Sequence, residues 1–308
     1  MPGHKRWVLL ANPLDYLPNP VGFEIFRRTS NDHWAPRCRY VELILNGDHK
    51  GLYLLSEQIR IDKNRVNIKS LKETDIIGDA VTGGYLISYD DTFDEEPKFR
   101  SAFFNMPVMI KSPDDDIVSE QLNYIQQYIN DAELSLYDDN MFNNGDFYQY
   151  FDIASWIDYY FVEELWGAYE LKRPRSVWLY KDRNGKLTAG PCWDMEQNYF
   201  HQQQLYCEKA LYYQRFFLSD SFVKDMKQRW VGFRSNLLGN EKYNNIIQYI
   251  DSLYEVSKFA ARRDRQMTPS AHNYHLPSKE STIDLEYNVM RNGIQSKIDW
   301  LENYIMSL

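Results

Sequence analysis

The sequence contains no apolar run that approaches the roughly 18 residues needed to cross a membrane. We therefore expect no transmembrane segment. The first ten residues, MPGHKRWVLL, also lack the layout of a signal peptide. Only three cysteines occur, Cys38, Cys192 and Cys207, and none belongs to a Cys-x-x-Cys pair. This spacing argues against a structural zinc site and a disulfide framework, although one disulfide beside one free thiol is compatible with the count.

Basic residues are scarcer than acidic ones. The 308 residues include 35 Lys and Arg against 44 Asp and Glu, a formal net charge of −9. A nucleic-acid-binding domain normally presents a concentrated basic face, and none is visible in the sequence. We expect no nucleic-acid partner.

Several motifs that would identify a common active site are missing. The sequence has no Gly-x-Gly-x-x-Gly, no Gly-x-x-x-x-Gly-Lys-Ser/Thr and no Gly-x-Ser-x-Gly. Their absence excludes a Rossmann or Walker-type phosphate loop and the commonest serine hydrolase. The six histidines form no His-Glu-x-x-His motif, and His272 and His275, in a predicted loop, are weak candidates for metal ligands. The remaining candidates are carboxylates.

What the sequence does contain is an order of strands followed by helices. Alternating apolar residues and turn signals predict strands and hairpins in the first third, whereas helical spacing dominates after residue 116. The predicted elements are a buried strand at 6–11, a loop at 12–20, a weak helix at 21–29, a hairpin at 40–45 and 51–56, and strands at 85–89 and 107–111. We predict an α+β fold with two unequal lobes, a β-rich lobe at 1–115 and a mainly helical lobe at 116–308.

The stretch from 156 to 200 organises the second lobe. Apolar residues at Ile157, Tyr160, Phe161 and Leu165 predict a helix packed on one face, with Asp152 as its N-cap. A β-hairpin follows at 176–181 and 186–191, turning at Asn-Gly. After it the pattern becomes mainly helical from residue 219, with an interrupting loop at about 267–277.

Acidic side chains flank this hairpin. Glu170 precedes it, and Asp194 and Glu196 follow two positions apart, so on a strand end both point to one side. Carboxylates suit Mg²⁺, which takes one or two from the protein, and Glu170 is placed to act as a base. By spacing alone, Asp194 is equally well explained as a cap of the next turn, and Glu170 is better explained by a surface ion pair with Lys172 or Arg173.

Two other acidic groups have simpler interpretations. The run from Asp90 to Glu96 is typical of a solvated loop. Glu163 and Glu164 are interpreted as one solvent-facing and one capping residue rather than as the carboxylate pair of a glycosidase.

The sequence resembles the spore coat protein H (CotH) kinase family over most of its length. The resemblance is carried by KRWVLLAN (5–12), YVELILNGDHKGLYLLSEQI (40–59), KNRVNI (63–68), GGYLISYD (83–90), MIKSPD (109–114) and ELKRPRSVWLYKDRNGKLTAGPCWDME (170–196). It implies a divergent, bilobal protein-kinase-like fold and transfer of phosphate from ATP to a protein hydroxyl with Mg²⁺. Asp194 then matches the metal-binding acid, Glu196 a second acid, and Glu170 the catalytic base.

The resemblance also implies a nucleotide-binding lobe. Glu57 is the candidate partner of the phosphate-binding lysine, and Lys111 is the candidate replacement for that lysine. The family's small-residue-rich and lysine-rich stretches would precede Trp7, so we expect the N-terminal lobe to lack its first hairpin. Two further departures are Ala168, where the family commonly has asparagine, and Glu196, where it usually has aspartate.

Three functions are compatible with these features. The first is a CotH-like atypical kinase, and the second is a catalytically inactive pseudokinase that acts as an assembly module of a cell surface or coat. The third, suggested only by acidic and aromatic composition, is a secreted protein that binds or cleaves carbohydrate. The resemblance implies a protein substrate or a surface or coat protein as partner, and an extracytoplasmic or surface location.

Overall fold

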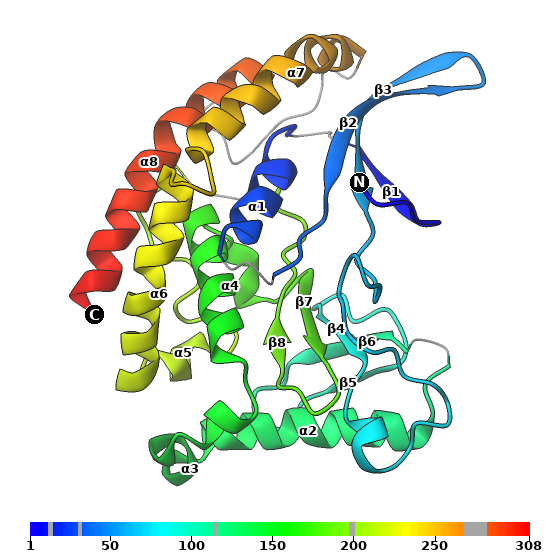
Figure 1. Cartoon of the computed structure of the whole chain (residues 1–308), viewed down its shortest axis with the longest axis vertical. Helices are drawn as coiled ribbons and strands as arrows, with labels where there is room; N and C mark the ends of the chain where they lie inside the picture. Colours follow the sequence, from blue (N-terminus) through cyan, green and yellow to red (C-terminus); the bar gives the residue numbers. More distant parts are fainter. Residues whose placement is uncertain (12–14, 30–32, 114–115, 197–200, 268–281) are drawn as a thin grey trace.

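In the computed structural model, the described residues are all except 12–14, 30–32, 114–115, 197–200 and 268–281. This part of the chain contains two antiparallel sheets and eight α-helices, and its C-terminal part is mostly helical (Figure 1). The predicted mixture of strands first and helices later is confirmed. None of the helices in the described ranges has the length and apolarity required to span a membrane.

The first sheet has three strands in the order β1-β3-β2. They are β1 (Trp7–Ala11), β2 (Cys38–Leu45) and β3 (Asp48–Glu57). Asn46 and Gly47 both have positive φ between β2 and β3, as the tightest hairpin turns require, so the predicted hairpin is confirmed. The predicted burial of β1 is wrong, since β1 pairs only with β3 and leaves Leu9 exposed at the edge of the sheet.

The second sheet has five strands in the order β5-β6-β4-β7-β8. They are β4 (Tyr85–Tyr89), β5 (Lys98–Arg100), β6 (Pro107–Ser112), β7 (Val177–Lys181) and β8 (Thr188–Ala189). The pairing of β7 with β8 confirms the second predicted hairpin. This sheet joins strands from both sides of residue 115, where the sequence predicts the boundary between two lobes, and that boundary stays a prediction.

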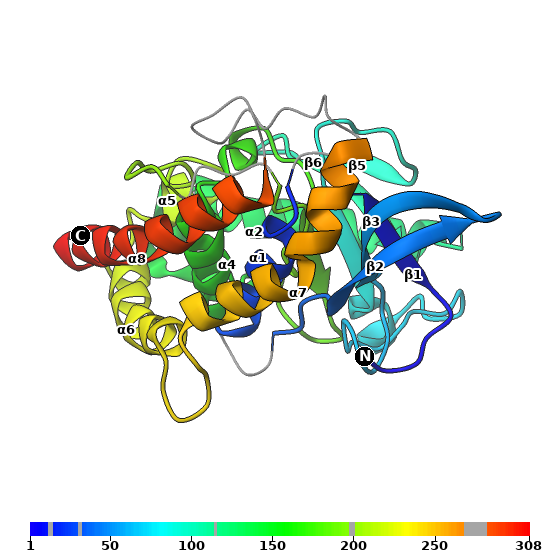
Figure 2. The same ribbon diagram turned by 90° about the horizontal axis from the view of Figure 1, so that it is seen from above.

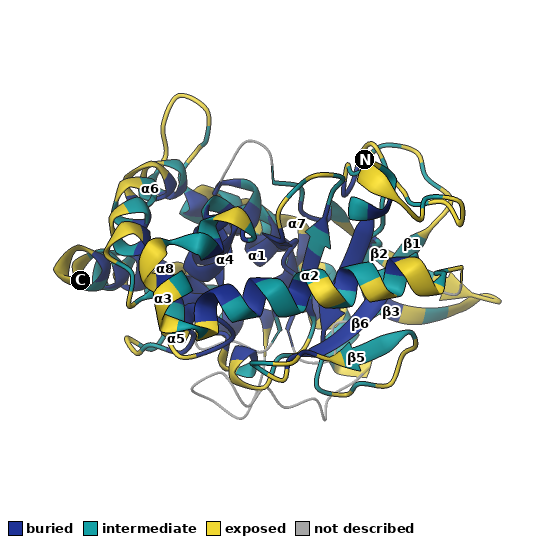
Figure 3. Cartoon of the chain, turned by 90° about the horizontal axis from the view of Figure 1, so that it is seen from below, coloured by how far each residue is buried: buried dark blue, intermediate teal, exposed yellow. Residues whose placement is uncertain are grey.

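Helix α2 (Ser119–Tyr137) covers one face of the five-stranded sheet (Figure 3). Tyr85 of β4 stacks on Tyr124 of α2 with ring centroids 6.1 Å apart, and Lys181 lies over the rings of Tyr124 and Tyr128. The short helices α3 (Asp139–Asn144) and η2 (Asp146–Gln149) follow, and η1 (Gly78–Thr82) precedes β4. On the opposite face of the sheet, Leu86 of β4 is buried in a cluster with Ile59 and Val66.

Helix α4 (Ile153–Trp166) is the centre of the helical part. It begins where predicted, although Asp152 makes no side-chain capping bond. The prediction of a helix packed on one face is wrong, because all but one of its residues are buried, including Asp158. Glu163 and Glu164 are both buried, so their predicted solvent-facing and capping roles are also wrong. Glu164 instead accepts the backbone N–H groups of Tyr206 and Cys207.

Helix α1 (Pro18–Arg27) lies between α4 and the three-stranded sheet (Figure 1). The sequence predicts a loop as far as residue 20, and this is wrong because the helix starts at Pro18. Proline is well tolerated in the first turn, where its missing N–H would have no helical partner. The rest of the predicted loop includes 12–14, which lie outside the described residues.

The remaining helices are α5 (Tyr213–Phe216), α6 (Asp220–Leu238), α7 (Ile246–Met267) and α8 (Ile283–Ser307). Tyr254 of α7 stacks on Tyr287 of α8 with centroids 4.0 Å apart, and the two helices run side by side in Figure 2. Asp264 of α7 accepts the N–H of Leu52 in β3 at 2.9 Å and so attaches the helical part to the three-stranded sheet.

Candidate functional site

The loop after β8, residues 190–196, carries the predicted metal acids and is held between α1 and α4. The backbone N–H of Met195 donates to the Asn19 side chain at 2.9 Å, and its carbonyl accepts from Trp166 Nε1 at 2.6 Å. The Met195 side chain packs so closely on Gly22 that a Cβ there would lie 2.6 Å from Met195 Cγ. Trp193 stacks on Phe23 of α1 with centroids 5.7 Å apart, and so anchors the loop on the other side of Asp194.

Asp194 is the most accessible acid of this loop. Its backbone has φ +59, and its Oδ2 accepts a hydrogen bond from Ser176 Oγ at 3.3 Å. The surrounding protein raises the pKa of Asp194 by desolvation, repulsion from Asp90 adds to this, and the Ser176 hydrogen bond opposes both. A carboxylate that is costly to ionise in this way gains from a bound cation.

Glu196 lies deeper in the same loop. Its Oε1 accepts from Asn19 Nδ2 at 3.0 Å. Burial, with repulsion from Asp194, raises the pKa of Glu196 to about 7. Asn19 thus contacts both Met195 and Glu196, and the sequence analysis missed it because it lies far away in the chain, in a segment predicted as a loop.

Glu170, the predicted base, lies in the short helix η3 (Tyr169–Lys172) and is half-buried. Burial raises the pKa of Glu170, repulsion from Asp194 adds to this, and Arg175 opposes them. The structure therefore brings Glu170 and Glu196 each within electrostatic reach of Asp194. The predicted ion pair with Lys172 or Arg173 is replaced by one with Arg175, whose Nη1 lies 3.8 Å from Glu170 Oε1.

Asp90 is a second residue of the site that the sequence analysis missed. Its Oδ2 accepts the backbone N–H of Ser176 at 3.1 Å, and Ser176 has the positive φ of 52 that turns the chain into β7. Asp90 also repels both Asp194 and Glu170. The sequence offered one sign of this role, because Asp90 directly follows the predicted strand at 85–89. In the structure this strand, β4, pairs with β7, so Asp90 lies beside the beginning of β7. The prediction of a solvated loop holds only in part, because Asp91 pairs with Arg100 and Arg173 and Glu95 pairs with Lys111.

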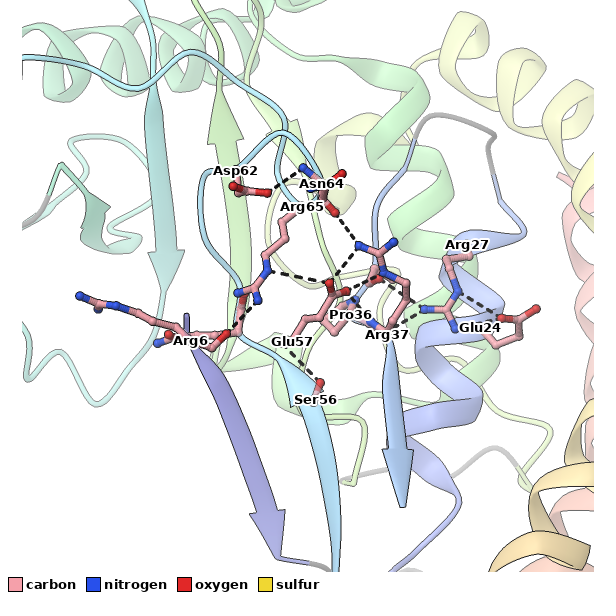
Figure 4. Close-up of polar contacts among 12 residues, drawn as sticks. Arg6, Glu24, Arg27, Pro36, Arg37, Ser56, Glu57, Asp62, Asn64 and Arg65 are labelled. Carbon is pink, nitrogen blue, oxygen red and sulfur yellow. Dashed lines mark hydrogen bonds and ion pairs between the residues drawn. The ribbon is translucent and has the colours of Figure 1, made fainter. Parts of the chain in front are cut away.

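Glu57 is buried at the end of β3 and pairs with arginines (Figure 4). Arg37 donates to both of its carboxylate oxygens, at 2.8 and 2.9 Å, and Arg65 Nε lies 3.9 Å away. Arg65 itself donates to the carbonyls of Gln58 and Arg6 and is buried. Among the described residues the ion-pair partners of Glu57 are these two arginines, and its predicted role beside a nucleotide stays a prediction.

Lys111 lies at the end of β6 in an open cavity of about 490 Å³. Its Nζ forms an ion pair with Glu95 and lies 5.8 Å from the centroid of the Trp178 ring. Glu95 and Trp178 line the same cavity, together with Arg6, Gln58 and Arg60. The cavity therefore combines an aromatic face with several cationic groups, which suits a phosphate-bearing aromatic ligand.

A second cavity of about 410 Å³ lies along the β7–β8 hairpin. It is lined by Trp34, Arg65, Tyr180 and Gly190, among others. The Arg65 guanidinium is already committed to two carbonyls and to Glu57.

The donors near Asp194 match the preferences of Mg²⁺. Carboxylate, carboxamide and hydroxyl oxygens are hard ligands of the kind this ion takes. In the described part of the chain, no group of three or more His, Cys, Asp or Glu side chains is arranged to hold a metal ion. His272 and His275 lie outside the described residues.

The similarity of this chain to a known protein family extends over every residue of the site. A family model described as CotH kinase protein matches residues 1–301, which include both sheets, the loop at 190–196 and most of α8. No curated protein matches the chain.

Proposed function

The chain belongs to the CotH kinase family, and from this premise we propose that it transfers the γ-phosphoryl group of Mg²⁺-bound ATP to a hydroxyl group of a protein. The proposal includes a bilobal, protein-kinase-like fold, with the three-stranded sheet in the smaller lobe. One observation carries most of it. Ser176, directly before β7, donates to Asp194, while Trp178, two residues later, lines the Lys111 cavity.

That observation connects a metal-binding acid to a nucleotide-sized space. Ser176 directly precedes β7 and Trp178 is the second residue of this strand, so the donor to Asp194 and the aromatic ring are close together in the chain. A nucleotide whose base stacks on Trp178 would extend its phosphates past the beginning of β7 toward Asp194. In this arrangement Lys111 exchanges Glu95 for a phosphate oxygen, and Arg60 provides a second cation.

Asp194 and Glu196 are the residues that would hold Mg²⁺, with Asn19 fixing Glu196. The bound ion would neutralise charge on the phosphate oxygens, which is the largest electrostatic requirement of phosphoryl transfer. It would also lower the raised pKa values of both acids, because a nearby cation favours the ionised form.

Glu170 would accept the hydrogen bond of the acceptor hydroxyl and orient its oxygen toward the γ-phosphorus. The new bond forms between that oxygen and the phosphorus while the bond to the β–γ bridging oxygen breaks, and the hydroxyl proton passes to Glu170. A raised pKa suits this role, because a base works best when its pKa is close to the operating pH. Desolvation and the neighbouring Asp194 both raise the pKa of Glu170.

The second candidate is a pseudokinase that acts as an assembly module of a cell surface or coat. It is favoured by Glu57, which is saturated by Arg37 and Arg65 rather than by a lysine within the described residues. Ala168, where the family commonly has asparagine, points the same way. In either form we place the protein outside the cytoplasm, with a surface or coat protein as its partner. A role in carbohydrate binding or cleavage has no further support.

Calorimetric titration with Mg²⁺–ATP is the first test. The wild type should bind, and Asp194→Asn should weaken binding about tenfold or more because a metal ligand is lost. Asp48→Asn, at the exposed tip of the β2–β3 hairpin, is the matched control. Binding followed by transfer that Glu170→Gln abolishes would support the kinase, and binding without any transfer would support the pseudokinase. No binding by the wild type would reject the kinase and leave a protein that acts only in adhesion or assembly.

A further inference from the structure

Glu286, in the first turn of α8, is a buried carboxylate that the proposed reaction does not use. The other buried side chains of this helix are apolar except for Lys297. Burial raises the pKa of Glu286, because a carboxylate is costly to remove from water. A carboxylate at such a position is tolerated only where hydrogen bonds replace the lost hydration.

The hydrogen bonds of Glu286 go to the backbone immediately before α1. The Tyr16 N–H lies 3.0 and 3.1 Å from the two carboxylate oxygens, and the Leu17 N–H also donates to Oε1. Leu17 is the N-cap residue of α1, and its apolar side chain cannot cap the helix. A carboxylate from α8, 269 positions away in the chain, accepts the N-cap N–H instead, as the glutamate of a capping box does.

The turn of α1 that Glu286 holds is the one that carries Asn19. Asn19 follows Leu17 by two residues, and its amide contacts both Met195 and Glu196. Besides burial, repulsion from Glu196 raises the pKa of Glu286, so the two carboxylates are within electrostatic reach of each other. One helical turn and one side chain thus connect Glu286 to a proposed metal ligand.

Tyr16 also has contacts on its other groups. Its hydroxyl donates to Asp264 of α7 at 2.8 Å, and its carbonyl accepts from the Tyr40 hydroxyl of β2 at 2.6 Å. These two bonds attach the chain before α1 to α7 and to the three-stranded sheet. Neither involves an N–H group, so within the described ranges Glu286 is the acceptor for both Tyr16 N–H and Leu17 N–H.

We infer that Glu286 is a positioning residue for the proposed metal site, which holds the first turn of α1 so that Asn19 can fix Met195 and Glu196. The inference rests on the proposed function, because it assigns a supporting residue to the same site. In this role Glu286 acts through Asn19 and makes no contact of its own with the nucleotide or the ion.

The first test follows the loop at 190–196 without any nucleotide. In protein labelled with ¹⁵N at methionine, hydrogen exchange of the Met195 amide reports its bond to Asn19, and the amide of Met226 in α6 reports any general loss of stability. Relative to Met226, we expect Glu286→Ala to speed Met195 exchange about tenfold. Adding Glu286→Ala to Asn19→Ala should change little, because both substitutions act on one hydrogen bond.

Asp284→Ala is the matched control, since it removes an acid from the same turn of α8. Asp284 is 40% exposed and pairs with Arg262 of α7. This variant should leave Met195 exchange unchanged relative to Met226. Glu286→Gln keeps the shape of the side chain and one acceptor oxygen, so it should give a smaller change in the direction of Glu286→Ala. It also decides the question if Glu286→Ala does not fold.

A second measurement connects the position of the loop to the metal. Glu286→Ala should raise the Kd for Mg²⁺–ATP about threefold to tenfold and leave the Kd for ATP in excess EDTA unchanged. A merely structural role would raise both Kd values equally, and that result would overturn the inference.

The outcomes separate this inference from the proposed function. Met195 exchange that stays at the wild-type rate in Glu286→Gln and Glu286→Ala, relative to Met226, would overturn the inference whatever the nucleotide titration gives. Faster Met195 exchange in these variants, with no change in Asp284→Ala, supports the positioning role even if the wild type binds no nucleotide. In that case the kinase proposal alone fails.

Discussion

Asn19 and Glu196 lie 177 positions apart in the chain, yet the Asn19 amide donates to the Glu196 carboxylate at 3.0 Å. The other end of the same amide accepts the Met195 N–H at 2.9 Å. One buried side chain of α1 thereby sets the position of the loop that carries both proposed metal ligands.

The first prediction concerns this amide. Asn19→Ala should lower the free energy of unfolding by about 1–3 kcal/mol, because it leaves the buried Met195 N–H without its partner. It should also weaken Mg²⁺–ATP binding, since Glu196 loses its donor. Urea denaturation and calorimetry measure the two effects. Asn140→Ala, at an exposed position of α3, should change neither.

The second prediction concerns the contact of α1 with the loop at 190–196. Gly22→Ala should destabilise the protein by about 1–3 kcal/mol, because the added methyl group would lie 2.6 Å from Met195 Cγ and force the loop to move. Gly232→Ala in α6 is the matched control, with no neighbour within 4 Å of its added methyl group. That control should be neutral or stabilising by about 0.5–1 kcal/mol, since alanine favours helix more than glycine does. Equal effects of the two substitutions would contradict the proposed role of Gly22.

The third prediction concerns how Asp194 is positioned. Ser176→Ala removes the hydrogen bond to Asp194 and should raise the Kd for Mg²⁺–ATP about threefold to tenfold, the range expected for one such bond. Asp90→Ala should act in the same direction because it removes the acceptor of the Ser176 N–H, an effect that the lost repulsion between Asp90 and Asp194 partly offsets. Ser221→Ala, in the exposed first turn of α6, serves as control. An unchanged Kd in both site variants would show that Asp194 needs neither residue.

The fourth prediction is a pH dependence of stability. Burial raises the pKa of Glu163 from 4.5 to about 8, with Asp194 adding to the shift and Tyr159 opposing it. The folded state thus favours the protonated form. The stability that the folded state gains from protonated Glu163 is complete below pH 4.5 and is lost as the pH rises to about 8. The loss in the free energy of unfolding is about 1.4 kcal/mol for each unit by which the folded and unfolded pKa values differ.

In Glu163→Gln the side chain carries no charge at any pH, so this variant should not lose stability as the pH rises. The wild type should therefore lose stability relative to the variant between pH 5 and pH 8, as measured by urea denaturation at several pH values. Glu120→Gln, exposed in the first turn of α2, should follow the wild-type profile. Parallel profiles for the wild type and Glu163→Gln would mean that Glu163 ionises normally.

The sequence by itself determined the elements that depend on neighbouring residues. The Asn46–Gly47 turn and the alternation on either side of it specify the β2–β3 hairpin, because only a few residues accept the positive φ of that turn. The β7–β8 hairpin was also readable from its alternating residues and its Asn184–Gly185 turn signal, although only Asn184 of this pair has a positive φ. The order of Glu170, hairpin and Asp194 was therefore readable in advance. The family motifs were readable for the same reason, as they are contiguous stretches.

Only the tertiary structure decided which polar groups are buried and what they contact. Glu163 and Glu164 look like surface residues of a helix, yet α4 is enclosed on all sides. Glu57 looked like a partner for lysine, and the fold supplies Arg37 and Arg65. Asn19 reaches the loop at 190–196 only because α1 packs against α4. Local periodicity records which faces are apolar, but the partner that makes a buried polar group tolerable comes from a distant part of the chain.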